Sequence, residues 1–176
     1  MGNWVSVYCE DPAISLAVGS KSEAVLQHVL EANSDLSDGA QECLQRLIEG
    51  DVPSDEQTDG VDFVRSYRAI CHAYAGKETT VEIYVDEEQF PEMWEFVWAA
   101  GQPPQRLPLS EFGSPAIGYW DKAAVARLED LFADLDFAAL AKRTKGRRYE
   151  KEIAEVREVL RAARAANCGA YVFFEE

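Results

Sequence analysis

The sequence predicts an α+β fold, in which a small sheet contains both terminal strands and packs with six to eight helices. The strands are indicated by short aromatic and β-branched segments at opposite ends of the chain, residues 4–9 and 170–174. Between them, most apolar residues recur every three or four positions, which indicates amphipathic helices. The 176 residues, 47% of them apolar, suffice for one core without internal repeats, so we expect residues 1–176 to form a single globular domain.

The two terminal segments are expected to pair with each other. Both are short and rich in aromatic and β-branched residues, which stabilise a sheet when they face one another across neighbouring strands. Chain ends of one domain also commonly lie close together in space. We therefore predict that the first and last strands lie in one sheet and bury alternate side chains.

Helix start and stop signals divide the N-terminal part of the chain into four predicted helices. Asp11 caps a short helix that Gly19 ends. Ser20 and Glu23 then form a capping box for a second helix. Two further helices carry their apolar residues on one face and are predicted over residues 37–49 and 60–75.

The remainder of the chain adds an internal strand and four more helices. Alternating β-branched residues predict a strand over residues 79–85. The segment 113–118 contains two glycines and is predicted to be a turn before the next helix. That helix is capped by Asp121, and its Leu131 is expected to face inward. The other helices are predicted over residues 91–100, 137–140 and 149–166.

Charge is distributed unevenly along the chain. The formal net charge is -15, yet six of the seventeen basic side chains fall within residues 142–151. Residues 1–60 carry a net charge of -10, residues 61–141 carry -8, and residues 142–176 carry +3. We call the five most concentrated cations the basic island: Lys142, Arg143, Lys145, Arg147 and Arg148.

The basic island has three interpretations. It is a solvated connection neutralised by the protein's own acids, a docking surface for an acidic partner or a second copy, or a nucleic-acid contact. Removing its five charges from the net -15 leaves -20 on the rest of the chain. That charge repels a polyanion within a Debye length of about 8 Å, so nucleic acid is the least favoured partner.

An aromatic cluster in the predicted helix at residues 91–100 is a second candidate for partner contact. Trp94 and Trp98 stand in a short helix that carries large apolar groups on all sides. Such a helix is either buried on two sides or exposes an aromatic patch. We favour burial, and the exposed patch remains the alternative.

The residue types that carry catalysis or bind cofactors form no recognisable pattern here. The two histidines, His28 and His72, lie within predicted helices, and the four cysteines lack CxxC spacing. With 32 acids in the chain, close carboxylate pairs arise without a functional reason. We therefore predict no catalytic residue, no metal site and no cofactor. The cysteines are expected to be packing residues that react slowly with thiol reagents in the native protein.

The apolar segments are also informative about location. The longest of them fall far short of the about 20 residues needed to span a bilayer. The first residues lack the basic and apolar regions of a signal peptide. We therefore expect no membrane association and a cytoplasmic location.

Four short segments are distinctive in their sequence and in their position relative to the predicted helices and strands. They are Met1-Gly2 with Tyr8 in the first strand, and residues 18–20, 115–119 and 169–174. In these segments the sequence resembles a group of uncharacterised bacterial domain-of-unknown-function proteins and, more remotely, the YfbM-like proteins. The resemblance implies an α+β fold and no catalytic residue.

Composition favours a non-enzymatic acidic protein that acts by binding another protein, as immunity or inhibitor proteins do with basic toxins. The alternative is a protein, or an enzyme, that binds a small molecule or phosphorylated ligand. Its pocket would lie between the aromatic helix and a face formed by Arg157, Arg161 and Arg164. A deep apolar pocket with converging polar groups favours the alternative, and a flat acidic surface without a pocket favours protein binding. The sequence leaves the oligomeric state open.

Overall fold

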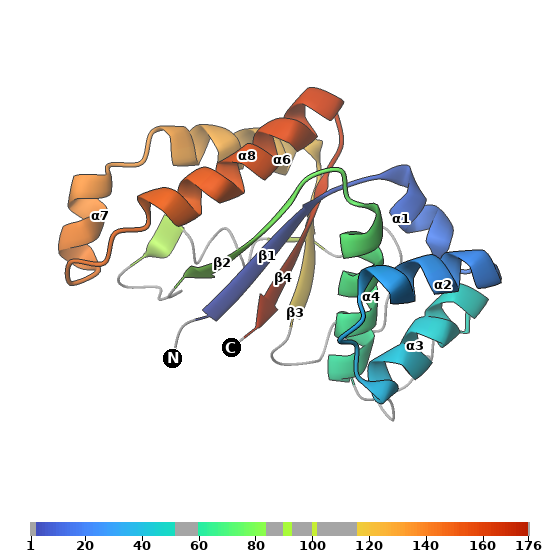
Figure 1. The fold of residues 1–176 in the computed structure, drawn as a ribbon. Coiled ribbons are helices and arrows are strands. Elements are labelled where there is room, and N and C mark those ends of the chain that lie inside the picture. The colour runs from blue at the N-terminus through green and yellow to red at the C-terminus, as the bar shows by residue number, and fades with distance from the viewer. Residues whose placement is uncertain (1–2, 52–59, 84–89, 93–99, 102–115, 176) are drawn as a thin grey trace.

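The computed structural model describes residues 3–51, 60–83, 90–92, 100–101 and 116–175. Its centre is an antiparallel four-stranded sheet with the strand order β2-β1-β4-β3 (Figure 1). The strands are β1 (Asn3–Cys9), β2 (Glu78–Ile83), β3 (Ala116–Trp120) and β4 (Ala170–Glu175). The Trp94 and Trp98 side chains lie outside the described residues.

The two terminal strands are hydrogen-bonded neighbours at the centre of the sheet. Val5 lies opposite Phe174, and Val7 lies opposite Val172. The N- and C-terminal ends of the chain consequently lie side by side (Figure 1). The predicted pairing of the terminal segments is confirmed, and so is the α+β fold.

Helices cover both faces of the sheet, and seven are present in the described residues. One layer consists of α1 (Pro12–Ala17), α2 (Glu23–Ala32), α3 (Asp38–Glu49) and α4 (Gly60–Tyr74). The other layer consists of α6 (Lys122–Ala133), α7 (Phe137–Arg143) and α8 (Glu150–Ala166) (Figure 1). None of these helices combines the length and the apolar character that crossing a membrane requires.

The period of two along each strand separates the interior into two apolar clusters. Val5 and Val7 of β1 contact the α6–α8 layer, whereas Tyr8 contacts the α1–α4 layer. In β4, the residues Ala170 to Phe174 are all buried, because helices cover both sides of that strand. The same sheet therefore contains β4, which is buried along its length, and β2, in which buried and exposed residues alternate.

Helix caps follow the predicted signals with one correction. The Asp11 carboxylate accepts a hydrogen bond from the Ala13 amide, as predicted for the start of α1. The cap of α2 is Ser22, whose hydroxyl accepts from the Val25 amide at 3.4 Å, rather than Ser20. Lys21 adopts a left-handed φ of 54°, which turns the chain so that the helix begins two residues later than the capping-box pattern suggested.

Segment 113–118 was predicted to be a turn, and its described part is instead a strand. Residues 116–120 form β3, in which Ile117 lies opposite Phe173. Gly118 is required by close packing, since a Cβ there would collide with the Ala100 side chain and lie 3.2 Å from Cγ1 of Val172. The sequence pattern was interpreted as a turn because it contains glycine, whereas Gly118 is needed so that Ala100 can pack closely against the strand.

The inward orientation predicted for Leu131 is also wrong. Leu131 is 36% exposed, whereas Leu128 and Phe132 of the same helix are buried. Consecutive helical residues point about 100° apart, and the position next to Phe132 falls at the margin of the buried face of α6.

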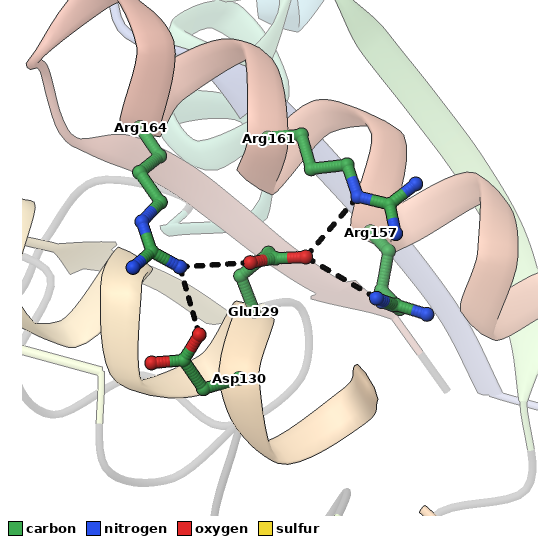
Figure 2. Close-up of polar contacts among 5 residues, drawn as sticks. All are labelled: Glu129, Asp130, Arg157, Arg161 and Arg164. Atoms are coloured by element: carbon green, nitrogen blue, oxygen red, sulfur yellow. Dashed lines mark hydrogen bonds and ion pairs between the residues drawn. The ribbon is translucent and has the colours of Figure 1, made fainter. Parts of the chain in front are cut away.

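An ion-pair cluster joins α6 to α8. Glu129 lies between three arginines of α8 (Figure 2), at 3.2 Å from Arg157, 3.1 Å from Arg161 and 2.8 Å from Arg164. The Arg164 guanidinium also contacts Asp130 at 2.8 Å. Burial would raise the pKa of the Glu129 carboxyl, but hydrogen bonds from the three arginines outweigh burial and lower it. The three arginines predicted to face a ligand pocket therefore contact the protein's own carboxylates.

Replacing Glu129 with Gln should lower the free energy of unfolding by about 1 to 2 kcal/mol. The substitution removes a carboxylate that is only 12% exposed and leaves three neighbouring cations without their shared anion. Asp130→Asn is the matched control, because Asp130 is 64% exposed and should change stability by less than about 1 kcal/mol. Urea unfolding of both variants measures the difference, and equal effects would contradict the assignment.

The contribution of Glu129 should also depend on pH. Its folded-state pKa lies below the ordinary value of 4.5, so its stabilisation is fully present above pH 4.5. That stabilisation is lost as the pH falls through the lower, folded-state pKa. The stability gap between the wild type and Glu129→Gln should therefore narrow below pH 4.5, and a gap that stays constant there would contradict the mechanism.

Candidate functional site

A polar pocket of about 410 Å³ opens on the α1–α4 side of the sheet. It lies between α4, the strands β2, β1 and β4, and the connection from α2 to α3. The charged and aromatic side chains that line it are Tyr8, Asp35, Arg65, Arg68, His72, Glu78 and Glu175.

Local structure explains why these side chains meet. Arg65, Arg68 and His72 follow one another at intervals of three and four residues, so they share one face of α4. In β2, Glu78 and Thr80 alternate with Val81 and Ile83, whose side chains enter the opposite cluster. The helix and the strand are joined by a short connection, which places the polar face of α4 beside the polar face of β2.

Arg68 is fixed in the wall of the pocket by two contacts. Its Nε donates a hydrogen bond to the Tyr8 hydroxyl at 3.1 Å, and its Nη1 lies 3.3 Å from the Glu175 carboxylate. Burial raises the pKa of Tyr8 despite the opposing effect of Arg68, so the phenol keeps its proton at neutral pH. The Tyr8 hydroxyl therefore accepts from Arg68 and retains an O–H that can donate to a ligand.

His72 is oriented by an acid on the neighbouring strand. Its Nδ1 lies 2.8 Å from the Glu78 carboxylate, which accepts the ring N–H. This contact orients the ring and places a proton on Nδ1, which leaves Nε2 available for a further hydrogen bond. In the part of the chain that the structure describes, Nε2 has no hydrogen-bond partner.

Arg65 and Asp35 are the charged residues of the pocket that have no ion-pair partner among the described residues. Both are exposed, and neither makes an ion pair with another described residue. Arg68 and His72 by contrast each contact a carboxylate of the pocket wall. The pocket therefore offers one available cation and one available anion to a molecule that enters it.

The basic island lies at the end of α7 and in the turn to α8, on the opposite side of the sheet from the polar pocket (Figure 1). Lys142, Lys145 and Arg148 are exposed and make no ion pair with the described residues. Arg143 pairs with Glu92 at 2.9 Å. The remaining member, Arg147, is also exposed.

The turn that carries the island is held by a buried threonine. Thr144 is buried, and its hydroxyl lies 3.0 Å from the Leu140 carbonyl and 2.8 Å from the Arg147 carbonyl. Lys145 and Gly146 follow it with left-handed φ angles of 55° and 89°. The cations of the island are therefore displayed on a structured turn.

Sequence reasoning missed the polar pocket. The apolar face of α4 was recognised, and its Val64, Tyr67 and Cys71 are buried as expected. The signal on the other face was the spacing of Arg65, Arg68 and His72, which any solvated helix face also shows. Only the approach of β2 and the α2–α3 connection converts that face into a pocket.

The fold and the site define a small α+β protein with an antiparallel sheet between two helical layers and a polar pocket at one edge of that sheet. Among the described residues, no three His, Cys, Asp or Glu side chains converge in a manner that would hold a metal ion. The chain belongs to the DUF7691 family, a domain of unknown function, whose model matches residues 1–175. No curated protein and no solved structure matches the chain.

The two arginines of the pocket should differ in their contribution to stability. Arg68→Leu leaves Glu175 and the Tyr8 hydroxyl without their shared donor, so we expect a loss of about 1 kcal/mol in the free energy of unfolding. Arg65→Leu should change it by less than about 0.5 kcal/mol. Urea unfolding tests this difference, and an effect of Arg65→Leu as large as that of Arg68→Leu would show that Arg65 supports the fold.

Proposed function

We propose that the protein binds a small polar molecule in the pocket beside α4. The ligand carries a carboxylate or phosphate group at one end and hydrogen-bond donors, such as hydroxyl or amino groups, at the other. The observation that supports this proposal most directly is that Arg65 and Asp35 line the same pocket without partners among the described residues.

The size and rigidity of the site support small-molecule binding. A volume of about 410 Å³ lies within the range of ligand pockets in proteins, roughly 300 to 1,000 Å³. Arg68 and His72 are held by Glu175 and Glu78 before any ligand arrives. Such preorganised walls reduce the entropy that binding must overcome.

The charges of the pocket determine the ligand class. Arg65 provides a planar guanidinium that suits carboxylate and phosphate oxygens. Asp35 accepts hydrogen bonds and disfavours a ligand that is anionic throughout. Tyr8 supplies an O–H donor, and Nε2 of His72 is available for a further hydrogen bond. A molecule with one anionic end and one donor-rich end satisfies all four groups.

Titration with simple probes tests the proposal. Glycerol 3-phosphate carries both features, inorganic phosphate carries only the anion, and glycerol carries only the hydroxyls. We expect saturable NMR shift changes around α4 in that order of affinity. Arg65→Gln should weaken glycerol 3-phosphate binding about tenfold, because a charge-assisted hydrogen bond contributes roughly 1.4 kcal/mol.

Arg127→Gln is the matched control for this experiment. Arg127 is an exposed arginine on α6, in the other helical layer, and makes no ion pair among the described residues. Its replacement should leave binding unchanged. Equal weakening by both variants would indicate a general charge effect, and the absence of saturable binding by either phosphate probe would contradict the proposed ligand class.

Protein binding through the basic island is a second candidate function. It is supported by the exposure of Lys142, Lys145 and Arg148 without ion pairs in the described chain. An acidic molecule that displays a local basic surface is suited to an acidic partner or a second copy. The acidic remainder of the surface suits a basic partner instead, and in that interpretation the protein is a non-enzymatic, immunity- or inhibitor-like protein of the bacterial cytoplasm. A remote relation to YfbM-like proteins remains a prediction as well.

Charge reversal distinguishes a docking role of the island from a structural one. The double substitution Lys142→Glu and Lys145→Glu should lower the free energy of unfolding by less than about 1 kcal/mol if these side chains serve a partner. If they neutralise the protein's own acids, the melting temperature should fall and added salt should restore it. Lys122→Glu with Arg127→Glu is a matched control on α6.

The wild type should also fail to bind a polyanion resin at physiological salt. The net charge of -15 opposes that contact across most of the surface. Retention that falls steeply with salt and disappears in the island variant would instead support nucleic-acid binding.

A further inference from the structure

Two cysteines that are far apart in the sequence lie next to each other in the structure. The Sγ atoms of Cys9 and Cys168 are 3.5 Å apart, although 159 positions separate the residues. Cys9 is the last residue of β1 and is buried, whereas Cys168 follows α8 and is partly exposed. Cys43 and Cys71 are buried in the cluster on the other side of the sheet, as expected of packing residues, whereas the partial exposure of Cys168 differs from that expectation.

Hydrogen bonds fix the backbone on both sides of this thiol pair. The Glu10 amide donates to the Gly169 carbonyl at 3.0 Å, and the Cys168 amide donates to the Ala163 carbonyl at 3.0 Å. The Glu10 carboxylate accepts from the Gly169 amide at 2.7 Å and from the Tyr119 hydroxyl at 2.8 Å. The two sulfur atoms are therefore held together by a rigid frame and do not meet by chance motion of a loop.

We propose that Cys9 and Cys168 form a dithiol site, which a peroxide oxidises reversibly to an intramolecular disulfide. A disulfide requires a sulfur separation of about 2.05 Å, so the two atoms must approach by roughly 1.5 Å. Rotation of the two side chains provides this movement, because one of them lies at the end of a strand and the other in a connection.

The chemistry proceeds in two balanced steps. The Cys168 thiol first releases its proton to solvent. The thiolate then attacks one oxygen of hydrogen peroxide, breaks the O–O bond and becomes a sulfenic acid, while the second oxygen leaves as hydroxide, which the released proton converts to water. The Cys9 sulfur then attacks the Cys168 sulfur, which expels hydroxide. The proton from the Cys9 thiol converts that hydroxide to a second water. Two thiols and one peroxide thus give one disulfide and two waters.

The environment assigns different roles to the two thiols. Burial raises the pKa of Cys9, and its contact with the Cys168 thiol raises it further, so Cys9 remains protonated at neutral pH. The first attack on peroxide therefore belongs to Cys168, which is also the more exposed of the two. Cys9 acts second, because it is buried and its sulfur lies 3.5 Å from that of Cys168.

The disulfide would join the end of β1 to the connection between α8 and β4. The loop that it closes contains nearly the whole chain, and the restriction of the unfolded state grows with loop length. We expect the oxidised protein to melt at least about 5 °C above the reduced protein. Oxidation therefore acts as a reversible covalent lock on the central strand pair.

The test uses the full chain and hydrogen peroxide at equimolar amounts. The oxidised wild type should lose two hydrogen atoms by intact mass, yield a Cys9–Cys168 peptide without reduction and retain two of its four free thiols. Dithiothreitol should restore all four thiols and the lower melting temperature. Cys168→Ser should yield no disulfide and show no rise in melting temperature after oxidation.

Cys43→Ser is the control, because its sulfur lies in the other cluster, and it should still form the Cys9–Cys168 bond. The proposal is overturned if the wild type accumulates sulfinic acid at Cys168 without forming the disulfide. It is also overturned if the cross-link joins two chains or if the disulfide forms and the protein melts no higher than before. Circular dichroism confirms that Cys168→Ser is folded, and Cys168→Ala provides a second variant of the same position.

Discussion

The pairing of β1 with β4 is the constraint on which the rest of the structure depends. These strands come from the two ends of the chain and lie at the centre of the sheet, so every other layer packs against them directly or through a neighbour. Because helices cover both faces, the side chains of β4 enter two apolar clusters in alternation. The contacts that unite the two helical layers are therefore long-range contacts, which form only when the last residues of the chain meet the first.

The same pair of strands connects the two chemical features of the molecule. Tyr8 lines the polar pocket, and its neighbour Cys9 contacts Cys168 on the other side of the sheet. Successive residues of a strand point to opposite faces, so adjacent positions serve separate sites. At the opposite end of β4, Glu175 pairs with Arg68 in the pocket wall. Both sites thus include residues of the buried central strands, and helices complete them: α4 supplies Arg65 and Arg68 to the pocket, and the end of α8 positions Cys168.

The charged residues of the protein fall into two groups: those in ion pairs that stabilise the fold, and those without an ion-pair partner among the described residues, which can bind a ligand or a partner. The three arginines of α8 are engaged by Glu129, a side chain that is largely buried between α6 and α8 (Figure 2). Arg65 on α4 and Lys145 in the turn after α7 have no such partner in the described residues. Net charge alone does not distinguish these groups, because an arginine paired with a carboxylate and an unpaired one contribute the same unit of charge. The arginines paired with Glu129 therefore stabilise the fold, whereas Arg65 and Lys145 are available to ligands or partners.

The sequence by itself determined the local structure, and tertiary packing decided the sites. The cap at Asp11, the period of the helices and the aromatic terminal strands depend on neighbouring residues, and each appears where it was predicted. The strand at Ala116–Trp120 was missed, since the need for glycine at position 118 comes from Ala100 and Val172 rather than from its own neighbours. The pocket and the contact between Cys9 and Cys168 depend on which distant segments the sheet places side by side. Local patterns specify backbone conformation, whereas a site made of side chains from separate elements exists only after the register and the packing of those elements are fixed.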